Sequence, residues 1–279
     1  MTNSILLTLL IFVAALLYSA VGHGGASGYL AAMALFGVAP EMMKPTALVL
    51  NLFVAGIGTV RYARAGFFSW NIFWPFAVVS VPFAFLGGML KLPNDSYKII
   101  LGVVLLFAAW RLAVKPAATA PGAQKPIVLP LALIFGAGIG LLSGLTGVGG
   151  GIFLSPLLLL LGWADVRKTA GVSAAFILVN SVAGLLGHWQ SVKSLPGDLM
   201  WWVPAAFVGG LVGAELGSRR LTPLLMRRLL AAVLVVAGLK MLLTGEATKP
   251  EIRNPKSERK SESRTAAATT WHPVKSLKL

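Results

Sequence analysis

Two glycine-rich segments interrupt the apolar stretches of this sequence and offer the backbone chemistry of an anion site. They cover residues 22–25 (GHGG) and 147–151 (GVGGG). Glycine costs about 1 kcal/mol relative to alanine in a helix interior, so each run predicts a break in a helix. A helix that restarts after such a break presents free N–H groups and a positive dipole end, which suit an anion. The alternative interpretation is close packing of helices through small residues.

One histidine and two asparagines are the polar side chains best placed to assist these breaks. His23 lies inside the first break, where an imidazole can carry a proton at membrane depth. Val148 occupies the matching place in the second break, so a packing histidine is an equal alternative. Asn51 and Asn180 also occupy matching places, and their amides must face protein because lipid offers no hydrogen bonds. They either bond a neighbouring helix or contact an anion and brace the breaks.

Hydroxyl and charged side chains complete the candidates. Several hydroxyls can add donors to the same cavity or, more simply, bond their own helices: Ser27, Thr46, Ser143, Thr146, Ser155, Ser173 and Ser181. Lys44 and Lys168 follow Glu41 and Asp165 by three residues, in the first turn of a predicted helix, where a cation opposes the dipole. They are gating candidates, with a solvated surface pair as the alternative. The predicted anion-binding residues are Gly22, His23, Gly24, Gly25, Asn51, Gly147, Gly149, Gly150 and Asn180.

The composition indicates that the elements carrying these residues lie in lipid. Of 279 residues, 57% are hydrophobic and 12% are charged, and the mean hydropathy is +0.81. Soluble domains average roughly 45–50% apolar and about 25% charged residues, so a water-soluble globule would leave apolar surface exposed everywhere. The net charge of +15 is therefore assigned to membrane loops and anionic head groups, not to nucleic acid. At about 20 residues per crossing, the apolar length covers eight or more spans.

Apolar segments follow one another with short polar interruptions. They are expected over residues 4–21, 28–39, 46–63, 70–90, 97–114, 127–146, 152–163, 170–187, 199–217 and 224–243. The first could be mistaken for a signal peptide, but it has a counterpart in the second half of the chain and is taken as retained. The composition of residues 115–126 predicts a linker, and the composition of residues 244–279 predicts a disordered basic tail.

The second half of the chain repeats the landmarks of the first half in the same order. Besides the glycine segments and the asparagines, residues 87–88 match residues 209–210, and residues 97–112 match residues 226–241. We therefore expect an all-α polytopic membrane protein of two homologous halves, residues 1–114 and 127–243. Each half would have four to five transmembrane segments, giving eight full spans and half-helices at the breaks. Transporters built from such repeats bind substrate where the repeats meet.

The direction of the repeat depends on the breaks. If the segments flanking a break form one bent crossing, each half has four spans and the repeat is parallel. If they cross separately, each half has five and the repeat is inverted. Short loops favour inversion by eleven basic residues to four, but the basic tail reverses that count, so both arrangements stay open. The eleven are Arg61, Arg64, Arg111, Lys115, Lys125, Arg167, Lys168, Arg219, Arg220, Arg227 and Arg228.

Other classes of site find no support in the residues. No cysteine is present, which excludes disulfides, thiolate metal sites and a cysteine nucleophile. No paired carboxylates lie within the spans, no metal-ligand spacing appears, and no Ser/His/Asp set converges. We expect no enzyme activity, no metal and no cofactor.

The repeated unit resembles the sulfite exporter TauE/SafE family, also called the TSUP permeases. The likeness rests on the G-x-G-G turn after an apolar segment, on the lysine near the next helix start and on the Asn-x-x-x-x-Gly span, and it covers residues 4–243. Its closest part is the stretch 144–151 (GLTGVGGG) with Pro156 and residues 168–170 (KTA).

The resemblance implies transport of small sulfur-containing or carboxylate anions, such as sulfite, sulfonates or sulfoacetate, by a multi-pass permease of the inner membrane. The expected partners are this small anion, a coupling proton and the lipid bilayer, without nucleic acid. Two alternatives are a passive anion channel and a non-transporting membrane scaffold whose basic tail docks partners or anionic lipid.

Overall fold

The computed structural model describes residues 2–90, 106, 109–110, 124–189 and 195–243, and all regular secondary structure in this part of the chain is helical. The helices are α1 (Thr2–Ser19), α2 (Ala26–Leu35), α3 (Pro40–Arg64), α4 (Trp70–Met89), α6 (Leu129–Thr146), α7 (Gly151–Leu161), α8 (Val166–Gly187), α10 (Leu199–Glu215), a π-helix (Leu216–Arg220) and α11 (Pro223–Leu243). The predicted all-α class is confirmed for these residues. Most of the segment expected over residues 97–114, most of the linker and the tail lie outside them.

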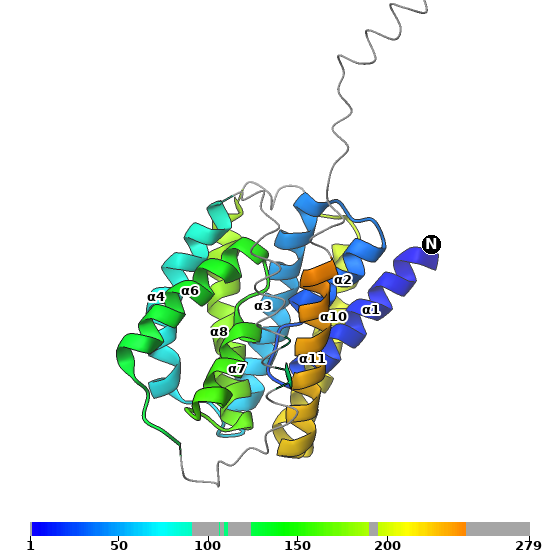
Figure 1. Cartoon of the computed structure of the whole chain (residues 1–279). Helices are drawn as coiled ribbons and strands as arrows, with labels where there is room; N and C mark the ends of the chain where they lie inside the picture. Colours follow the sequence, from blue (N-terminus) through cyan, green and yellow to red (C-terminus); the bar gives the residue numbers. More distant parts are fainter. Residues whose placement is uncertain (1, 91–105, 107–108, 111–123, 190–194, 244–279) are drawn as a thin grey trace, which may run out of the picture. The chain divides into compact units, whose positions relative to one another are not determined.

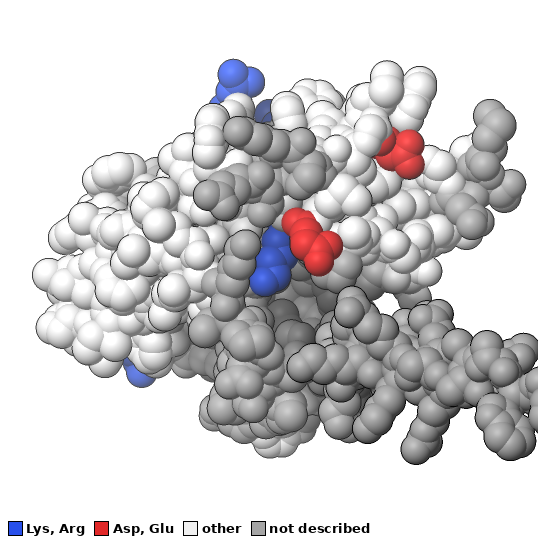
Figure 2. Space-filling view, turned by 90° about the horizontal axis from the view of Figure 1, so that it is seen from above, with Lys and Arg blue, Asp and Glu red and all other residues white. Residues whose placement is uncertain are grey.

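Five of these helices are long and apolar enough to cross a membrane. They cover Glu41–Arg64, Trp70–Met89, Leu129–Thr146, Val166–Gly187 and Leu199–Arg220. Shorter apolar helices lie beside the two breaks, over Ser4–Ser19, Ala26–Leu35 and Gly151–Leu161. Large apolar side chains such as Val78, Ile134 and Leu186 are more than half exposed on the helix surfaces. Apolar side chains exposed in this way suit lipid, because water would leave them unburied. Figure 2 views the bundle from the end where α3 begins, and most of the described atoms visible there belong to uncharged residues.

Three helices, α1, α3 and α10, run in the same direction. Gly209 and Gly213 of α10 lie against the carbonyls of Phe12 and Leu16 in α1, so residue numbers rise together along this pair. The same holds between α3 and α10, where Gly210 lies against Val54 and Glu215 pairs with Arg61. The glycines let the backbones approach closely, as is common between membrane helices.

Helices α4, α6 and α8 run in the opposite direction. Gly136 and Gly140 of α6 lie against Phe76 and Ser80 of α4, so these two helices are parallel. The turn after α3 lies beside the start of α8, and Gly88 at the end of α4 lies beside the end of α8, so α4 and α8 are parallel too.

The two sets of helices meet at α3 and α8, which pack side by side in the middle of the bundle (Figure 1). Leu48 of α3 lies against Gly184 of α8, whereas Gly58 lies against Ala174, so this central pair is antiparallel. The landmarks of the suggested repeat match α1 with α6, α3 with α8 and α4 with α10. In each of these pairs the two helices run in opposite directions.

The helix directions gather basic residues at one end of the bundle, where α3 and α10 end and α8 and α11 begin. Nine of the eleven residues predicted to share a side lie there: Arg61, Arg64, Lys125, Arg167, Lys168, Arg219, Arg220, Arg227 and Arg228. These nine lie together as the inverted arrangement requires, while Arg111 and Lys115 lie outside the described residues. We call this the basic end.

Candidate functional site

The two predicted breaks are real interruptions of the helices, and both are buried. Gly25 and Gly150 stand immediately before α2 and α7 with φ angles of 99° and 80°, in the left-handed region that glycine alone adopts without strain. No side chain caps either helix start. Each helix therefore begins inside the protein with its first N–H groups and positive dipole end facing the break.

The breaks come together at Asn51, near the middle of α3. A side chain at Gly24 would collide with the Oδ1 atom of Asn51. A Cβ at Gly149 would lie 2.9 Å from Nδ2 of the same amide and 2.8 Å from Ile177 Cγ2. The Nδ2 group donates to the carbonyl of Val148 at 3.3 Å. One carboxamide thus lies between the first break and the second and holds the second by a hydrogen bond.

His23 reaches from the first break into the start of α7. Its Nε2 atom lies 3.1 Å from the Oγ atom of Ser155, and that hydroxyl lies 2.8 Å from the hydroxyl of Ser173 in α8. His23 also lies close to Gly151, at the beginning of α7. The imidazole therefore joins both breaks through a chain of buried polar groups. Its Nδ1 atom is buried and has no hydrogen-bond partner within the described part of the chain.

Two tyrosines hold the first break, although neither was predicted from the sequence to be part of the site. Tyr29 Oη donates to the carbonyl of Gly24 at 2.6 Å, and Tyr62 Oη donates to the carbonyl of Ala20 at 2.8 Å. Both side chains are fully buried. Tyrosine normally finds a partner for its hydroxyl when buried. The position of Tyr29, four residues after Gly25, could have indicated its contact with the break. No sequence pattern related Tyr62 to the carbonyl of Ala20, which lies 42 residues earlier.

The outer ends of the breaks pack against the starts of the central helices. Gly22 has no room for a side chain because the backbone of Ala170, early in α8, touches it. Gly147 faces the backbone of Lys44, early in α3. The glycines of each break therefore also allow close packing, which was the alternative interpretation. The same glycines therefore interrupt the helices and allow the helices to pack closely.

The two asparagines differ in their contacts although both are fully buried. Asn180 Nδ2 donates to the carbonyl of Phe176 in its own helix at 2.8 Å. Among the described residues, no hydrogen bond joins Asn180 to either break. The predicted hydroxyls divide in the same way: Ser155, Ser173 and Ser181 join the cluster around the breaks, whereas Thr146 bonds the carbonyl of Leu142.

The gating candidates lie at opposite ends of the central helix pair. Lys168 Nζ donates to Gln124 Oε1 at 3.2 Å at the basic end. Asp165 caps α8 by accepting from the backbone N–H groups of Arg167 and Lys168, and it also accepts from Gln124 Nε2. Lys44 lies beside Gly147 at the other end. The last residues of the predicted linker are therefore bound to the turn before α8.

Several buried polar atoms around the breaks lack hydrogen-bond partners in the described part of the protein. They include His23 Nδ1, Asn51 Oδ1, Asn180 Oδ1 and Ser143 Oγ. An unsatisfied buried polar group costs about 1–3 kcal/mol, so several together are typical of a site completed by a ligand or water. No group of His, Asp or Glu suited to a metal ion occurs among the described residues. The backbone N–H groups at the uncapped helix starts are donors suited to a small anion, whereas the unpartnered amide oxygens of Asn51 and Asn180 are acceptors and suit water or a protonated group.

Comparison with known proteins points to membrane transport. Residues 7–241 match the family described as "Sulfite exporter TauE/SafE". The probable membrane transporter protein y4hK of Sinorhizobium fredii is 44% identical over 244 residues, 86% of this chain and 99% of that protein. The probable membrane transporter protein YjnA of Bacillus subtilis is 26% identical over 83% of this chain and 96% of that protein.

One similar protein is much longer than this chain. The probable membrane transporter protein MamO of Paramagnetospirillum magneticum is 24% identical over 78% of this chain, but the match covers only 41% of MamO. No solved structure was found to match the chain.

Proposed function

Because the chain belongs to the sulfite exporter TauE/SafE family of multi-pass membrane transporters, we propose that it is a secondary-active permease of the inner membrane. Its proposed substrates are small sulfur-containing or organic anions. The proposed substrates include sulfite, sulfonates and sulfoacetate. The observation that carries the proposal is the meeting of two uncapped helix starts, those of α2 and α7, around one buried carboxamide. Membership in a transporter family favours transport over catalysis.

The proposed site replaces the hydration shell of the anion with neutral donors. The backbone N–H groups that follow Gly25 and Gly150 point positive dipole ends at the site, and the Asn51 amide and His23 imidazole stand beside them. A desolvated anion gains most from such fixed donors because little water competes with them. The remaining predicted residues are proposed to shape this site: Gly22, Gly24, Gly147, Gly149 and Asn180.

The helix directions favour an inverted repeat of two halves, residues 1–114 and 127–243, with the site between them. Matching helices run in opposite directions, as in transporters whose repeats are related by an axis in the membrane plane. We propose eight full spans, with α2 and α7 as half-helices that begin at the breaks. In this arrangement Lys44 and Lys168 lie at opposite mouths of the site, where each can attract the anion on its own side. Counted over the short loops without the basic tail, the charge bias would place the basic end in the cytoplasm.

Anion flux in proteoliposomes tests this function. The purified protein is expected to carry sulfite and a sulfonate with saturable kinetics, and an imposed pH gradient is expected to drive accumulation. Saturable, gradient-coupled flux separates a permease from the passive channel, which would only dissipate gradients. A variant lacking residues 244–279 is expected to retain flux, because the site lies outside that segment. Absence of flux of either anion from correctly inserted protein would refute the proposal.

A further inference from the structure

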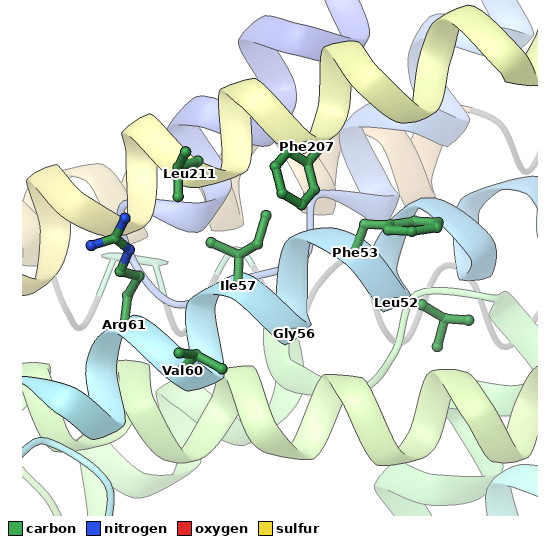
Figure 3. A pocket seen from close by; sticks show the side chains of 8 residues that line it. All are labelled: Leu52, Phe53, Gly56, Ile57, Val60, Arg61, Phe207 and Leu211. Atoms are coloured by element: carbon green, nitrogen blue, oxygen red, sulfur yellow. The ribbon is translucent and has the colours of Figure 1, made fainter.

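A groove on the outer surface of the bundle lies between α3 and α10. It has a volume of about 380 Å³, and Figure 3 shows its lining residues: Leu52, Phe53, Gly56, Ile57, Val60, Arg61, Phe207 and Leu211. All of them except Arg61 are apolar side chains or glycine. A Cβ at Gly56 would meet only Leu178 Cδ1, at 4.0 Å, so the surface of α3 is free of crowding at this lining residue. The groove therefore suits an apolar chain.

The length of the groove corresponds to one leaflet of a bilayer. Leu52 and Arg61 are nine residues apart on α3, which is about 14 Å at about 1.5 Å per residue. The hydrocarbon core of a bilayer is about 30 Å thick, so one leaflet provides roughly half of that. Leu52 follows Asn51 in the middle of α3, whereas Arg61 lies near the basic end. The groove thus runs from mid-membrane to the level of the head groups.

The mouth of the groove carries excess positive charge. Glu215 Oε2 accepts from Arg61 Nη1 at 2.9 Å, and Glu215 Oε1 lies 3.3 Å from Arg219 Nε. Arg64 follows Arg61 by one turn of α3, and Arg220 ends the π-helix that follows Glu215. Both are exposed, and neither makes an ion pair within the described ranges. Among the described residues where α3 and the π-helix end, two arginines pair with Glu215, and Arg64 and Arg220 add two positive charges that no ion pair balances.

We propose that this groove binds one acyl chain of an anionic phospholipid from the leaflet at the basic end, with its phosphate beside Arg64 and Arg220. Apolar lining alone would accept the chain of any lipid. The unbalanced arginines favour a head group with net negative charge, because a zwitterionic head group brings its own cation. Basic pockets between membrane helices are known to select acidic head groups in this way.

Native mass spectrometry of the full-length protein with phosphatidylglycerol and phosphatidylcholine of the same acyl chains tests the proposal, and substitutions in the groove test its acyl part. We expect preferential retention of phosphatidylglycerol. Gly56→Leu fills the groove and should reduce this retention. Gly138→Leu is the matched control, because Gly138 in α6 faces open space and lines no part of the groove. Equal retention of both lipids by the parent protein would overturn the proposal.

Charge substitutions test the head-group part and do not depend on how Gly56→Leu folds. Arg64→Gln should lower the preference for phosphatidylglycerol about fivefold, the effect of one basic residue near an anionic surface. Arg228→Gln removes an exposed charge from the same end but away from the groove, and should leave the preference unchanged. Equal effects of both substitutions would overturn the proposal. A Gly56→Leu variant that changes the fraction of dimer but not lipid retention would assign the groove to a second copy of the chain instead.

Discussion

Replacing Gly149 by alanine is the sharpest test of how the second break is built. Gly149 has a φ angle of 84°, and an added methyl group would lie 2.8 Å from Ile177 Cγ2, 2.9 Å from Asn51 Nδ2 and 3.1 Å from Ser181 Oγ. The substitution therefore strains the backbone and also pushes against the amide that joins the two breaks.

The magnitude follows from three effects. A left-handed conformation costs an alanine about 1–2 kcal/mol, and overpacking a closed interior costs about 1–3 kcal/mol. Losing the hydrogen bond from Asn51 to Val148 removes about 0.5–1.5 kcal/mol. The Gly149→Ala variant should thus lose about 2.5–6.5 kcal/mol of the stability of the described geometry. Because each 1.4 kcal/mol changes a population about tenfold, transport should fall by far more than about tenfold.

Gly66→Ala separates backbone strain from disruption of the site. Gly66 has a φ angle of 81°, but a side chain there would meet nothing within 4 Å. Gly66→Ala should therefore incur only the cost of the left-handed conformation, and its transport should stay near that of the parent. Sulfite flux in proteoliposomes, with insertion checked for both variants, measures the difference. Parent-like flux of an inserted Gly149→Ala protein would refute the reasoning, as would equal losses in the two variants.

Three further predictions concern the titratable and hydroxyl groups. His23→Gln should abolish the stimulation of flux by a pH gradient, whereas a variant with the same pH dependence as the parent would confine His23 to packing. Ser155→Ala removes the partner of both His23 and Ser173 and should lower flux about fivefold, the equivalent of roughly 1 kcal/mol. The pKa of His188, just beyond α8, is lowered by burial and by the charge of Lys44, while its hydrogen bond with the Gly184 carbonyl raises the pKa by a smaller amount. Its neutral form is therefore favoured in the folded state, so thermal stability should fall as the pH drops below the unfolded value of about 6.5, and His188→Gln should flatten this dependence.

Much of the helical layout could be predicted because hydropathy and glycine carry it directly. The expected segment over residues 70–90 and the helix Trp70–Met89 differ by one residue at one end. Both breaks occur where glycine clusters, since an L side chain is strained at φ angles such as those of Gly25 and Gly150. The starts of α3 and α8 were placed too late, because polar and charged first turns interrupt the apolar pattern used to find them.

The contacts between the breaks could not be predicted, because they depend on tertiary approach. Asn51 and Asn180 looked equivalent in the sequence, yet one lies between the breaks and the other bonds its own helix. The pairing of His23 with Ser155 joins residues 132 positions apart. The direction of the repeat was also open, since loop charges alone gave conflicting counts. Close contacts between helices such as Gly136 with Phe76 provide the directions that hydropathy lacks.

Binding of radiolabelled sulfite to the purified protein and to the Asn51→Ala and Asn180→Ala variants tests the central claim most directly. Both substitutions remove a fully buried carboxamide from the middle part of a central helix, but only Asn51 lies between the two helix breaks. The proposed site predicts that Asn51→Ala weakens binding by at least about tenfold, equivalent to about 1.4 kcal/mol, and that Asn180→Ala weakens it clearly less. Parent-like binding by Asn51→Ala, in protein shown to be folded, would contradict the placement of the anion between the breaks.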